Sequence, residues 1–266
     1  MALGEIARAQ GVRLLSLGTV DSTNDEARRL IEAGERGPLW VIAAHQTQGR
    51  GRLGRRWLSP QGNLHASLIL NACDEASLAP QLGFVAGVAT LKALRHLCPR
   101  QNFTLKWPND LLLSGDKIGG ILLENIMTQT GDARQPTTSV SIIGIGVNCK
   151  NAPDGLPYPT RALKSLGVHA PSVLELTHAL TDAFVAVLAL WRRGLGFAQI
   201  RNEWLSCAAG LGQEIHVTLA YETLVGRFEE IDSIGRLVLS GPKGKRLIEA
   251  GDVLLGPRPV VTETLR

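Results

Sequence analysis

Residues 39–70 read LWVIAAHQTQGRGRLGRRWLSPQGNLHASLIL. The first six residues are continuously apolar and the last eight have an apolar residue in every second place, so both ends are predicted to be strands. Between them, Gly49, Gly51 and Gly54 match the G-x-G-x-x-G pattern of dinucleotide-binding loops. Those loops turn a strand directly into a helix. Here the chain passes through Pro60 into a second strand, so the context argues against a nicotinamide cofactor.

Helices and further strands are predicted on both sides of this stretch, which indicates an α+β fold with helices packed on a sheet. A helix is expected over residues 21–37, with Thr23 as its N-cap. A longer helix over residues 171–194 opens with a capping box formed by Ser172 and Glu175. The other predicted elements are strands at 12–17, 103–107 and 139–149, a helix at 77–98, and a hairpin of DLLL and IGGILLEN around the turn SGDK.

From Gly212 onward, short strand-like segments alternate with glycine-containing turns. The segments are EIHVTL, TLVGRFEEI, RLVLS and KRLIEA. Their number and spacing predict a small all-β barrel. We therefore expect a larger domain at residues 1–210 and a small barrel domain at residues 211–266.

The composition indicates a protein with a large buried core. The chain has 266 residues, of which 44% are hydrophobic, and no run approaches the roughly 20 apolar residues of a membrane span. The first residues lack the pattern of a secretory signal, so we expect a cytoplasmic protein without membrane contact. The four cysteines stand far apart without a C-x-x-C pair, so no metal site is assigned and the thiols are expected to be structural.

The positive charge of the chain is concentrated between the two opening strands. The formal net charge is +4, and one loop carries as many arginines: Arg50, Arg52, Arg55 and Arg56. Guanidinium groups interleaved with glycines suit a carboxylate or phosphate ligand, because side-chain forks and backbone N–H groups can both approach the anion. Two alternatives stay open: a merely solvated loop, and a nucleic-acid surface on which Trp57 stacks with bases.

The same loop resembles a motif of a known family. GRGRLGRRW at residues 49–57 resembles the adenylate-binding loop of biotin protein ligases. Four more stretches are similar to that family's remaining motifs and follow in the same order: DSTN at 21–24, KWPND at 106–110, KIGGILLE at 117–124 and GIGVN at 144–148. The resemblance implies a mixed, mostly antiparallel sheet with helices packed on it, plus a small C-terminal SH3-like β-barrel. One departure is Leu53, where the family often carries an arginine.

The resemblance implies an ATP-dependent ligase that works in two steps. The biotin carboxylate attacks the α-phosphate of ATP, accompanied by Mg²⁺, to give biotinyl-5′-AMP. A lysine of a biotin carboxyl carrier protein or domain then attacks that mixed anhydride, and no prosthetic group is expected. A lipoate ligase or lipoyl/octanoyl transferase of the same architecture is the alternative enzyme.

Some family members carry an N-terminal helix-turn-helix domain. Only about 11 residues precede the first predicted strand here, so we expect the monofunctional class without that domain and without a nucleic-acid partner. Whether the protein is a monomer or a homodimer stays open, because exposed sheet edges cannot be located from the sequence.

The resemblance also implies roles for individual residues. Lys117 and Arg52 are expected to stabilise the charge that builds at phosphorus. Asp110 would either ligate Mg²⁺ or orient and deprotonate the acceptor lysine. The expected biotin-binding residues are Ser22, Thr23, Asn24, Gln46, Gly49, Arg50, Lys117, Gly119, Gly120, Gly144 and Gly146. The expected ATP- and adenylate-binding residues are Arg50, Gly51, Arg52, Arg55, Trp57, Asn109, Lys117 and Asn148, with Trp57 against the adenine ring and Asn148 at its edge.

Overall fold

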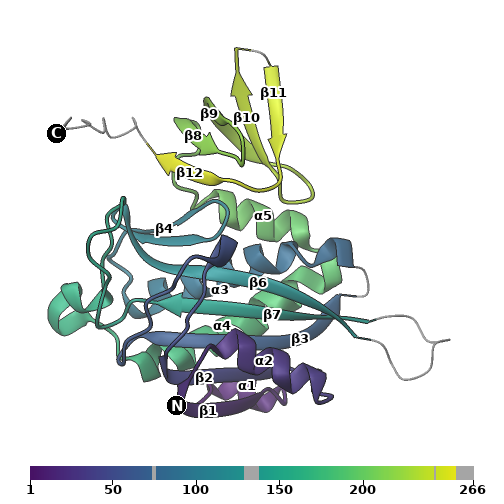
Figure 1. Cartoon of the computed structure of the whole chain (residues 1–266), viewed down its shortest axis with the longest axis vertical. Coiled ribbons are helices and arrows are strands. Elements are labelled where there is room, and N and C mark those ends of the chain that lie inside the picture. Colours follow the sequence, from purple (N-terminus) through teal and green to yellow (C-terminus); the bar gives the residue numbers. More distant parts are fainter. Residues whose placement is uncertain (74–75, 129–137, 243, 256–266) are drawn as a thin grey trace.

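The computed structural model describes residues 1–73, 76–128, 138–242 and 244–255, and its largest element is a seven-stranded mixed sheet (Figure 1). The strands are β1 (Arg13–Val20), β2 (Leu39–Gln46), β3 (Leu64–Cys73), β4 (Phe103–Lys106), β5 (Asp110–Leu113), β6 (Asp116–Thr128) and β7 (Thr138–Val147). They are arranged in the order β1-β2-β3-β7-β6-β5-β4. β1 and β2 run parallel and the other neighbours run antiparallel, which confirms the predicted mixed, mostly antiparallel sheet.

Helices pack on both faces of this sheet. They are α1 (Glu5–Ala9), α2 (Thr23–Glu32), α3 (Gln81–Leu97), α4 (Val173–Trp191) and α5 (Phe197–Leu205), with 3₁₀ turns at Arg52–Gly54, Ala76–Leu78, Leu163–His169 and Arg192–Gly194. α3 and α4 pack together behind the sheet in Figure 1, and α2 lies in front of it. Under α2, Ala27 and Ile31 are buried in one cluster with Val41, Ile69 and Ile142. Burial of a side chain as large as isoleucine contributes about 1.5–3 kcal/mol.

On the sheet face that carries α2, the side chains become smaller near the start of that helix. Under α2, β3 and β7 present Ile69 and Ile142. Two and four residues further along β7, the same face carries Gly144 and Gly146, because successive side chains alternate between the faces of a strand. On β3 the matching position is Ser67. The face that α2 covers therefore continues as a surface with little side-chain volume, which lets the side chains of Asn24 and Trp57 approach the backbone of β7 closely.

The two predicted N-caps have different outcomes. The Ser172 capping box at α4 is confirmed: the Ser172 backbone N–H donates to Glu175 at 2.8 Å, and the Glu175 N–H donates to Ser172 Oγ at 3.2 Å. The prediction of Thr23 as N-cap of α2 is wrong. Ser22 holds that position with extended backbone, and its Oγ accepts from the Asp25 N–H at 3.4 Å. Thr23 is already helical, and its hydroxyl points into a tertiary contact described below.

The hairpin of β5 and β6 closes through a two-residue turn. Ser114 and Gly115 have φ angles of 52° and 93°, as a type I′ turn requires. The predicted SGDK turn is therefore confirmed in place, while its last two residues, Asp116 and Lys117, already belong to β6. Lys117 is thus fixed by strand pairing rather than carried on a free loop.

A second sheet of five antiparallel strands lies beside α5 and β4 (Figure 1). Its strands are β8 (Glu214–Thr218), β9 (Thr223–Ile231), β10 (Leu237–Gly241), β11 (Gly244–Ile248) and β12 (Asp252–Leu255), in the order β11-β10-β9-β8-β12. Such a sheet fits the predicted SH3-like barrel. Residues 256–266 of the predicted small domain lie outside the described residues, and the boundary at residue 210 stays a prediction. Trp107 joins the two parts: it is buried and donates from Nε1 to the Gly235 carbonyl at 3.4 Å.

One described helix, α4 extended to Gly194, is long and apolar enough to cross a membrane by length and composition alone. Core helices of water-soluble proteins meet the same criterion. In this chain Leu180, Phe184 and Trp191 form a buried stripe along α4, which packs with α1, α3 and α5. These contacts place the buried stripe of α4 in the core of the protein.

Candidate active site

A cavity of about 730 Å³ lies on the glycine-bearing surface beside the start of α2. Its walls also include the glycine–arginine loop (residues 47–60), the segment between β4 and β5, residues 153–160 and the start of β12. Most of the sequence-predicted residues line it: Ser22, Thr23, Asn24, Gln46, Arg50, Gly51, Arg52, Arg55, Trp57, Asn109, Asp110, Lys117, Gly120, Gly144, Gly146 and Asn148. Gly49 and Gly119 belong to the predicted set but lie outside this lining.

The glycine–arginine loop is folded as a tight hairpin. The Trp57 N–H donates to the Gly49 carbonyl at 2.8 Å, and the Gly51 N–H donates to the Arg55 carbonyl at 2.7 Å. A Cβ atom on Gly49 would lie 2.5 Å from the Trp57 carbonyl oxygen, so glycine is needed there to close the hairpin. Leu53 is at the tip, has a φ of 55° and is 80% exposed, which places it away from the cavity.

Trp57 lies against the bare backbone of β7. A Cβ atom on Gly146 would approach the indole ring to 2.7 Å, so only glycine permits this contact. Lys117 Nζ lies 5.8 Å from the centroid of the same ring. Trp57 Nε1 is buried against the backbone of Gly146 and has no hydrogen-bond partner among the described residues. Gly119 allows the close pairing of β6 with β7, since its Cβ would lie 2.7 Å from the Gly146 carbonyl oxygen.

A group of neutral polar side chains forms the wall beside α2. Gln46 Oε1 accepts from the Thr23 N–H at 2.7 Å and from Thr23 Oγ1 at 3.0 Å, while Gln46 Nε2 donates to Ser59 Oγ at 2.7 Å. Ser67 Oγ lies 2.7 Å from Thr23 Oγ1 and 2.6 Å from Asn24 Oδ1. The sequence analysis did not assign Ser67. A signal was present, because Ser67 is a small polar residue followed directly by the apolar run Leu68–Leu70 of the same strand.

Asp110 is held between two lysines. Lys117 Nζ lies 2.5 Å from Asp110 Oδ1, and Lys106 Nζ lies 2.9 Å from Asp110 Oδ2. Burial raises the pKa of the Asp110 carboxyl, but the charges of Lys106 and Lys117 outweigh it, and the resulting pKa lies below the usual value. Lys106 was part of a quoted motif without a role. Tyr158, whose ring centroid is 5.4 Å from Lys117 Nζ, lies in a segment with no recognisable motif.

Two arginines of the loop have partners of different kinds. Arg52 donates to Asn109 Oδ1 at 3.3 Å and to the Gly251 carbonyl at 3.4 Å, so its hydrogen-bond partners among the described residues are neutral. Burial lowers the pKa of Arg52, which means that its charge is incompletely solvated. Arg50 is instead ion-paired with carboxylates of α2 and β6. Arg52 therefore remains the better cation for an incoming anion.

The small sheet closes one side of the cavity. Arg55 of the loop is ion-paired with Asp252 at the start of β12, and Lys106 Nζ donates to the Val253 carbonyl at 3.2 Å. Thr218 and Leu254 line the cavity as well. The small sheet therefore forms part of the same wall as the glycine–arginine loop.

Asn148 is fixed at the end of β7. It is 2% exposed, its backbone N–H donates to the Ile118 carbonyl at 2.7 Å, and its Nδ2 donates to the Arg161 carbonyl at 3.4 Å. The next residue, Cys149, is buried, and burial raises the pKa of its thiol to about 12. A thiol with that pKa is a poor nucleophile near neutral pH, in keeping with the expected structural role.

Fold and site together define an enzyme-like cavity for an anionic ligand, and comparison with known proteins identifies the family. Residues 18–148 match the biotin/lipoate A/B protein ligase family, and residues 210–256 match the biotin protein ligase C-terminal domain. A biotin–[acetyl-CoA-carboxylase] ligase of Paracoccus denitrificans is 40% identical over 249 residues, which cover 90% of this chain and 99% of the relative. The bifunctional ligase/repressor BirA of Bacillus subtilis is 30% identical over 92% of this chain and 75% of its own length.

A comparison with solved structures identifies the same family. The biotin protein ligase from Aquifex aeolicus in complex with biotin and ATP superposes with a TM-score of 0.74 at 26% identity, covering 91% of this chain and 97% of that chain. This chain therefore belongs to the biotin protein ligase family. The match of its C-terminal part to a domain of biotin protein ligases favours biotin over the lipoate alternative.

Proposed function

We propose that this chain activates biotin with ATP to form biotinyl-5′-AMP and transfers the biotinyl group to a lysine of a biotin carboxyl carrier protein or domain. The observation that carries the proposal is that one cavity combines an anion site, formed by Arg52 and Lys117, with a neutral polar wall formed by Thr23 and Gln46. The names of the relatives, and the biotin and ATP bound in the Aquifex aeolicus structure, support it.

The neutral wall suits the ureido head group of biotin. The hydroxyl of Thr23 and the amide of Gln46 are buried and bonded to each other in the ligand-free protein. A bound ureido group would take over some of these hydrogen bonds, which matters because a buried polar group without a partner costs about 1–3 kcal/mol. Gly120 leaves room for a flat bicyclic ring beside it, whereas the space above Gly144 is taken by Asn24, whose Oδ1 would lie 2.5 Å from a Cβ there.

Adenylation brings together two anions, the biotin carboxylate and the α-phosphate. A carboxylate oxygen forms the new bond to phosphorus while pyrophosphate leaves, and negative charge builds on the phosphoryl oxygens. Lys117 and Arg52 are proposed to stabilise that charge, because both are partly buried and fixed by neighbours before the substrates bind. Asn109 holds Arg52 by accepting a hydrogen bond from its guanidinium at 3.3 Å.

The nucleotide is proposed to lie against the glycine–arginine loop. Trp57 offers an apolar ring surface, and Asn148 offers a fixed amide for the adenine edge. Gly51 exposes backbone at the cavity, and Arg55 at its rim is held by the small sheet. Closing this wall would also keep water from the adenylate.

Magnesium is proposed to enter with ATP. Within the described residues no group of three or more His, Cys, Asp and Glu side chains could hold a metal. The Asp110 carboxylate, for which binding of Mg²⁺ was one of two expected roles, already contacts two lysines. The residues therefore fit an ion held through phosphate oxygens and water, as Mg²⁺ commonly is. Bound there, it would neutralise phosphate charge.

Asp110 is proposed to act in the transfer step. A carboxylate that binds two lysine ammonium groups can bind a third, the acceptor lysine, in exchange for one of them. Its lowered pKa makes it a weak proton acceptor, so its main effect would be to orient the amine at the carbonyl carbon of the adenylate. The amine nitrogen then bonds to that carbon, AMP leaves, and the proton departs to water.

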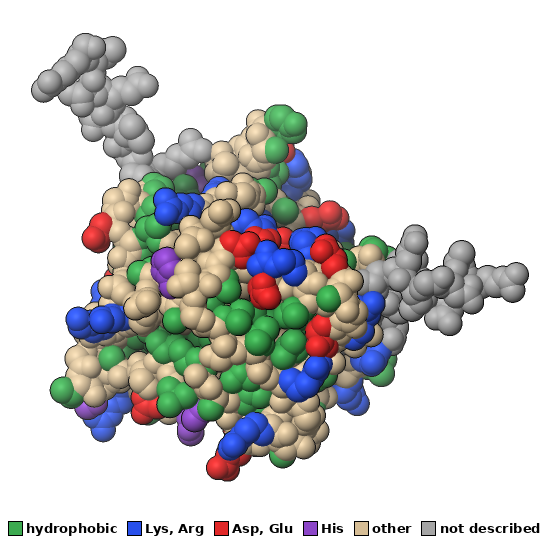
Figure 2. All heavy atoms as spheres, turned by 60° about the horizontal axis from the view of Figure 1, so that its bottom comes forward, with side chains coloured by type: hydrophobic (Ala, Val, Ile, Leu, Met, Phe, Trp, Pro, Cys, Tyr) green, Lys and Arg blue, Asp and Glu red, His purple; other side chains and the backbone are tan. Residues whose placement is uncertain are grey.

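The contacts of the loop argue against a nucleic-acid surface. Arg50 and Arg55 are paired with carboxylates of the same chain, and Arg52 lines the cavity. On the face drawn in Figure 2, Lys and Arg side chains stand among Asp and Glu side chains and form no continuous basic surface. Binding of nucleic acid would require a broader field of one sign.

The test is ATP–pyrophosphate exchange by the purified protein with Mg²⁺, run with biotin, with lipoate and with neither acid. Exchange that needs biotin, followed by labelling of a carrier domain but not of its lysine-to-arginine variant, is the expected result. Exchange with lipoate alone would move the specificity to the sister enzymes. Exchange with neither acid would contradict the proposed adenylation.

A further inference from the structure

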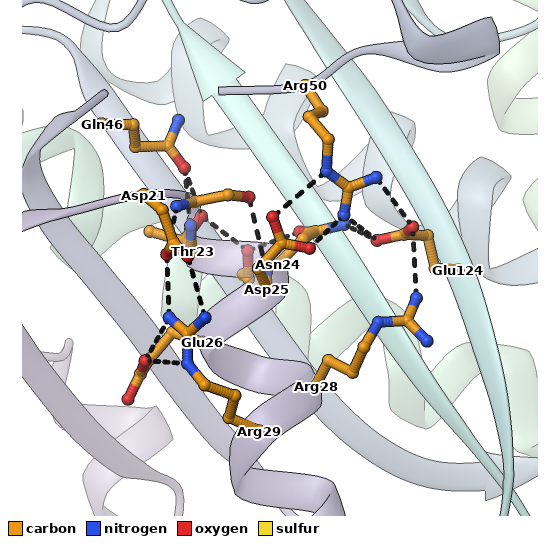
Figure 3. Close-up of polar contacts among 12 residues, drawn as sticks. Asp21, Thr23, Asn24, Asp25, Glu26, Arg28, Arg29, Gln46, Arg50 and Glu124 are labelled. Atoms are coloured by element: carbon orange, nitrogen blue, oxygen red, sulfur yellow. Dashed lines mark hydrogen bonds and ion pairs between the residues drawn. The ribbon is translucent and has the colours of Figure 1, made fainter. Parts of the chain in front are cut away.

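Arg50 of the glycine–arginine loop lies at the centre of a charge network (Figure 3). Its Nε lies 3.2 Å from Asp25 Oδ2, and its Nη2 contacts the other oxygen of the same carboxylate. Its Nη1 lies 3.3 Å from Glu124 Oε1, and Nη2 lies 3.5 Å from Glu124 Oε2. All three nitrogens of the guanidinium fork therefore have carboxylate partners supplied by the protein.

The two carboxylates are themselves fixed in place. Asp25 is in the first turn of α2, where the helix dipole favours a negative charge. Glu124 lies within β6 and accepts from Asn24 Nδ2 at 2.7 Å and from Arg28 Nη2 at 3.4 Å. The Glu124 side chain is only 19% exposed. A partly buried, fixed pair of acceptors holds an arginine better than a solvated surface pair does.

Arg50 helps to fix where the rest of the loop lies. Arg50 and Arg56 form an antiparallel bridge across the hairpin. The next pair toward its base joins Gly49 to Trp57, and Arg52 begins the turn at its tip. Because these residues belong to one hairpin, we expect loss of the Arg50 contacts to weaken the hold on Trp57 and Arg52 together, while Arg55 still contacts Asp252.

We propose that Asp25 and Glu124 are positioning residues that hold the glycine–arginine loop over the cavity through Arg50, and that the Arg50 guanidinium does not bind substrate. Its backbone can still meet the ligand. A substrate anion would have to displace two carboxylates from the fork, whereas Arg52 has only neutral hydrogen-bond partners among the described residues. The consequence for catalysis rests on the proposed function, but the loop contact itself does not.

The first test follows loop opening in the ligand-free protein by limited trypsin digestion at Arg52, Arg55 and Arg56. The Asp25→Asn/Glu124→Gln double variant should be cleaved in the loop about fivefold faster than the wild type. Arg50→Gln should be cleaved at these sites as fast as the double variant. Combining all three substitutions should not increase the rate further, since each variant breaks the same contact between Arg50 and the two carboxylates. Unchanged cleavage in the double variant would overturn the proposal.

A matched control separates the loop contact from effects on α2. Glu26 is also in the first turn, but it accepts from Arg29 Nε at 2.8 Å and does not contact the loop (Figure 3). Glu26→Gln removes the same helix-dipole contribution and should leave cleavage unchanged. Glu124→Gln keeps an oxygen acceptor for Asn24, so the neighbouring pocket retains its hydrogen bond.

The second test measures adenylation and adenylate loss without a carrier. The double variant and Arg50→Gln should raise the KM for biotin and the rate of adenylate loss by the same factor, about fivefold. If Arg50→Gln abolishes adenylation while the double variant keeps it, Arg50 binds substrate directly and the proposal is overturned. If the wild type forms no adenylate at all, the proposed function fails, while the trypsin result still decides the loop contact.

Discussion

Lys117→Ala should slow biotin adenylation by on the order of 10²-fold or more without unfolding the protein. At about 4 Å from a developing phosphoryl charge, a unit positive charge contributes about 4 kcal/mol at an effective dielectric constant near 20. Asp110 lies 2.5 Å from Lys117 Nζ and offsets part of that contribution. A remaining effect of about 3 kcal/mol corresponds to on the order of 10²-fold in rate. Asp110 keeps Lys106 at 2.9 Å, so its buried charge stays compensated.

The assay is single-turnover formation of biotinyl-5′-AMP in quenched-flow mixing, with thermal unfolding measured on the same preparations. Lys106→Ala is the matched variant, because it removes the other lysine of the pair while Lys117 stays in place. Its adenylation rate should fall by less than about tenfold. The reasoning is refuted if Lys117→Ala adenylates within tenfold of the wild type, or if Lys106→Ala falls as far as Lys117→Ala does.

Three further predictions use other parts of the molecule. Asp110→Asn should slow transfer to the carrier by about 10²-fold and adenylation by less than about tenfold, and an equal fall in both half-reactions would rule out a role specific to transfer. Gly146→Ala should raise the KM for ATP by about tenfold, because the new Cβ would lie 2.7 Å from the Trp57 indole; an unchanged KM would remove Trp57 from the nucleotide site. Hydrogen bonds from Arg13 lower the pKa of Glu35 to about 2, so its stabilisation is complete above the unfolded value near 4.5 and is lost as pH falls through about 2. Glu35→Gln should therefore lower the free energy of unfolding by about 1 kcal/mol at pH 7, allowing for the half-exposed Arg13, and by almost nothing near pH 2; a pH-independent difference in denaturant titrations would contradict this.

The main elements were predictable because their apolar periodicity was strong. The stripe on α4 and its Ser172–Glu175 capping box place a helix from the sequence alone. Short elements such as α1, α5 and β12 carry too few residues for a periodic signal, and none of them was predicted. At α2 two neighbouring residues could both serve as the cap. Thr23 is taken up by Gln46, a contact with another strand that no local pattern reveals.

At the candidate site, too, the sequence motifs identify residues, but their roles depend on contacts with distant parts of the chain. Gly119 and Gly120 are adjacent in the sequence and were assigned the same role. In the structure Gly120 lines the cavity, whereas Gly119 permits close packing against the carbonyl of Gly146. Lys106 was missed for a related reason, since its relevance comes from the shared Asp110 carboxylate and not from its motif.

Under the proposed function, charge pairing would leave Arg52 as the arginine among Arg50, Arg52 and Arg55 that serves the substrates. Arg50 is neutralised by carboxylates of α2 and β6, and Arg55 by Asp252 of the small sheet. Arg52, between them in sequence, has neutral partners and a pKa lowered by burial. A loop that closes over a reactive anhydride must be held by the protein before the anion arrives, because an open loop admits water. Two arginines that fix the hairpin on either side of a third meet this requirement, and they leave the least solvated charge facing the cavity.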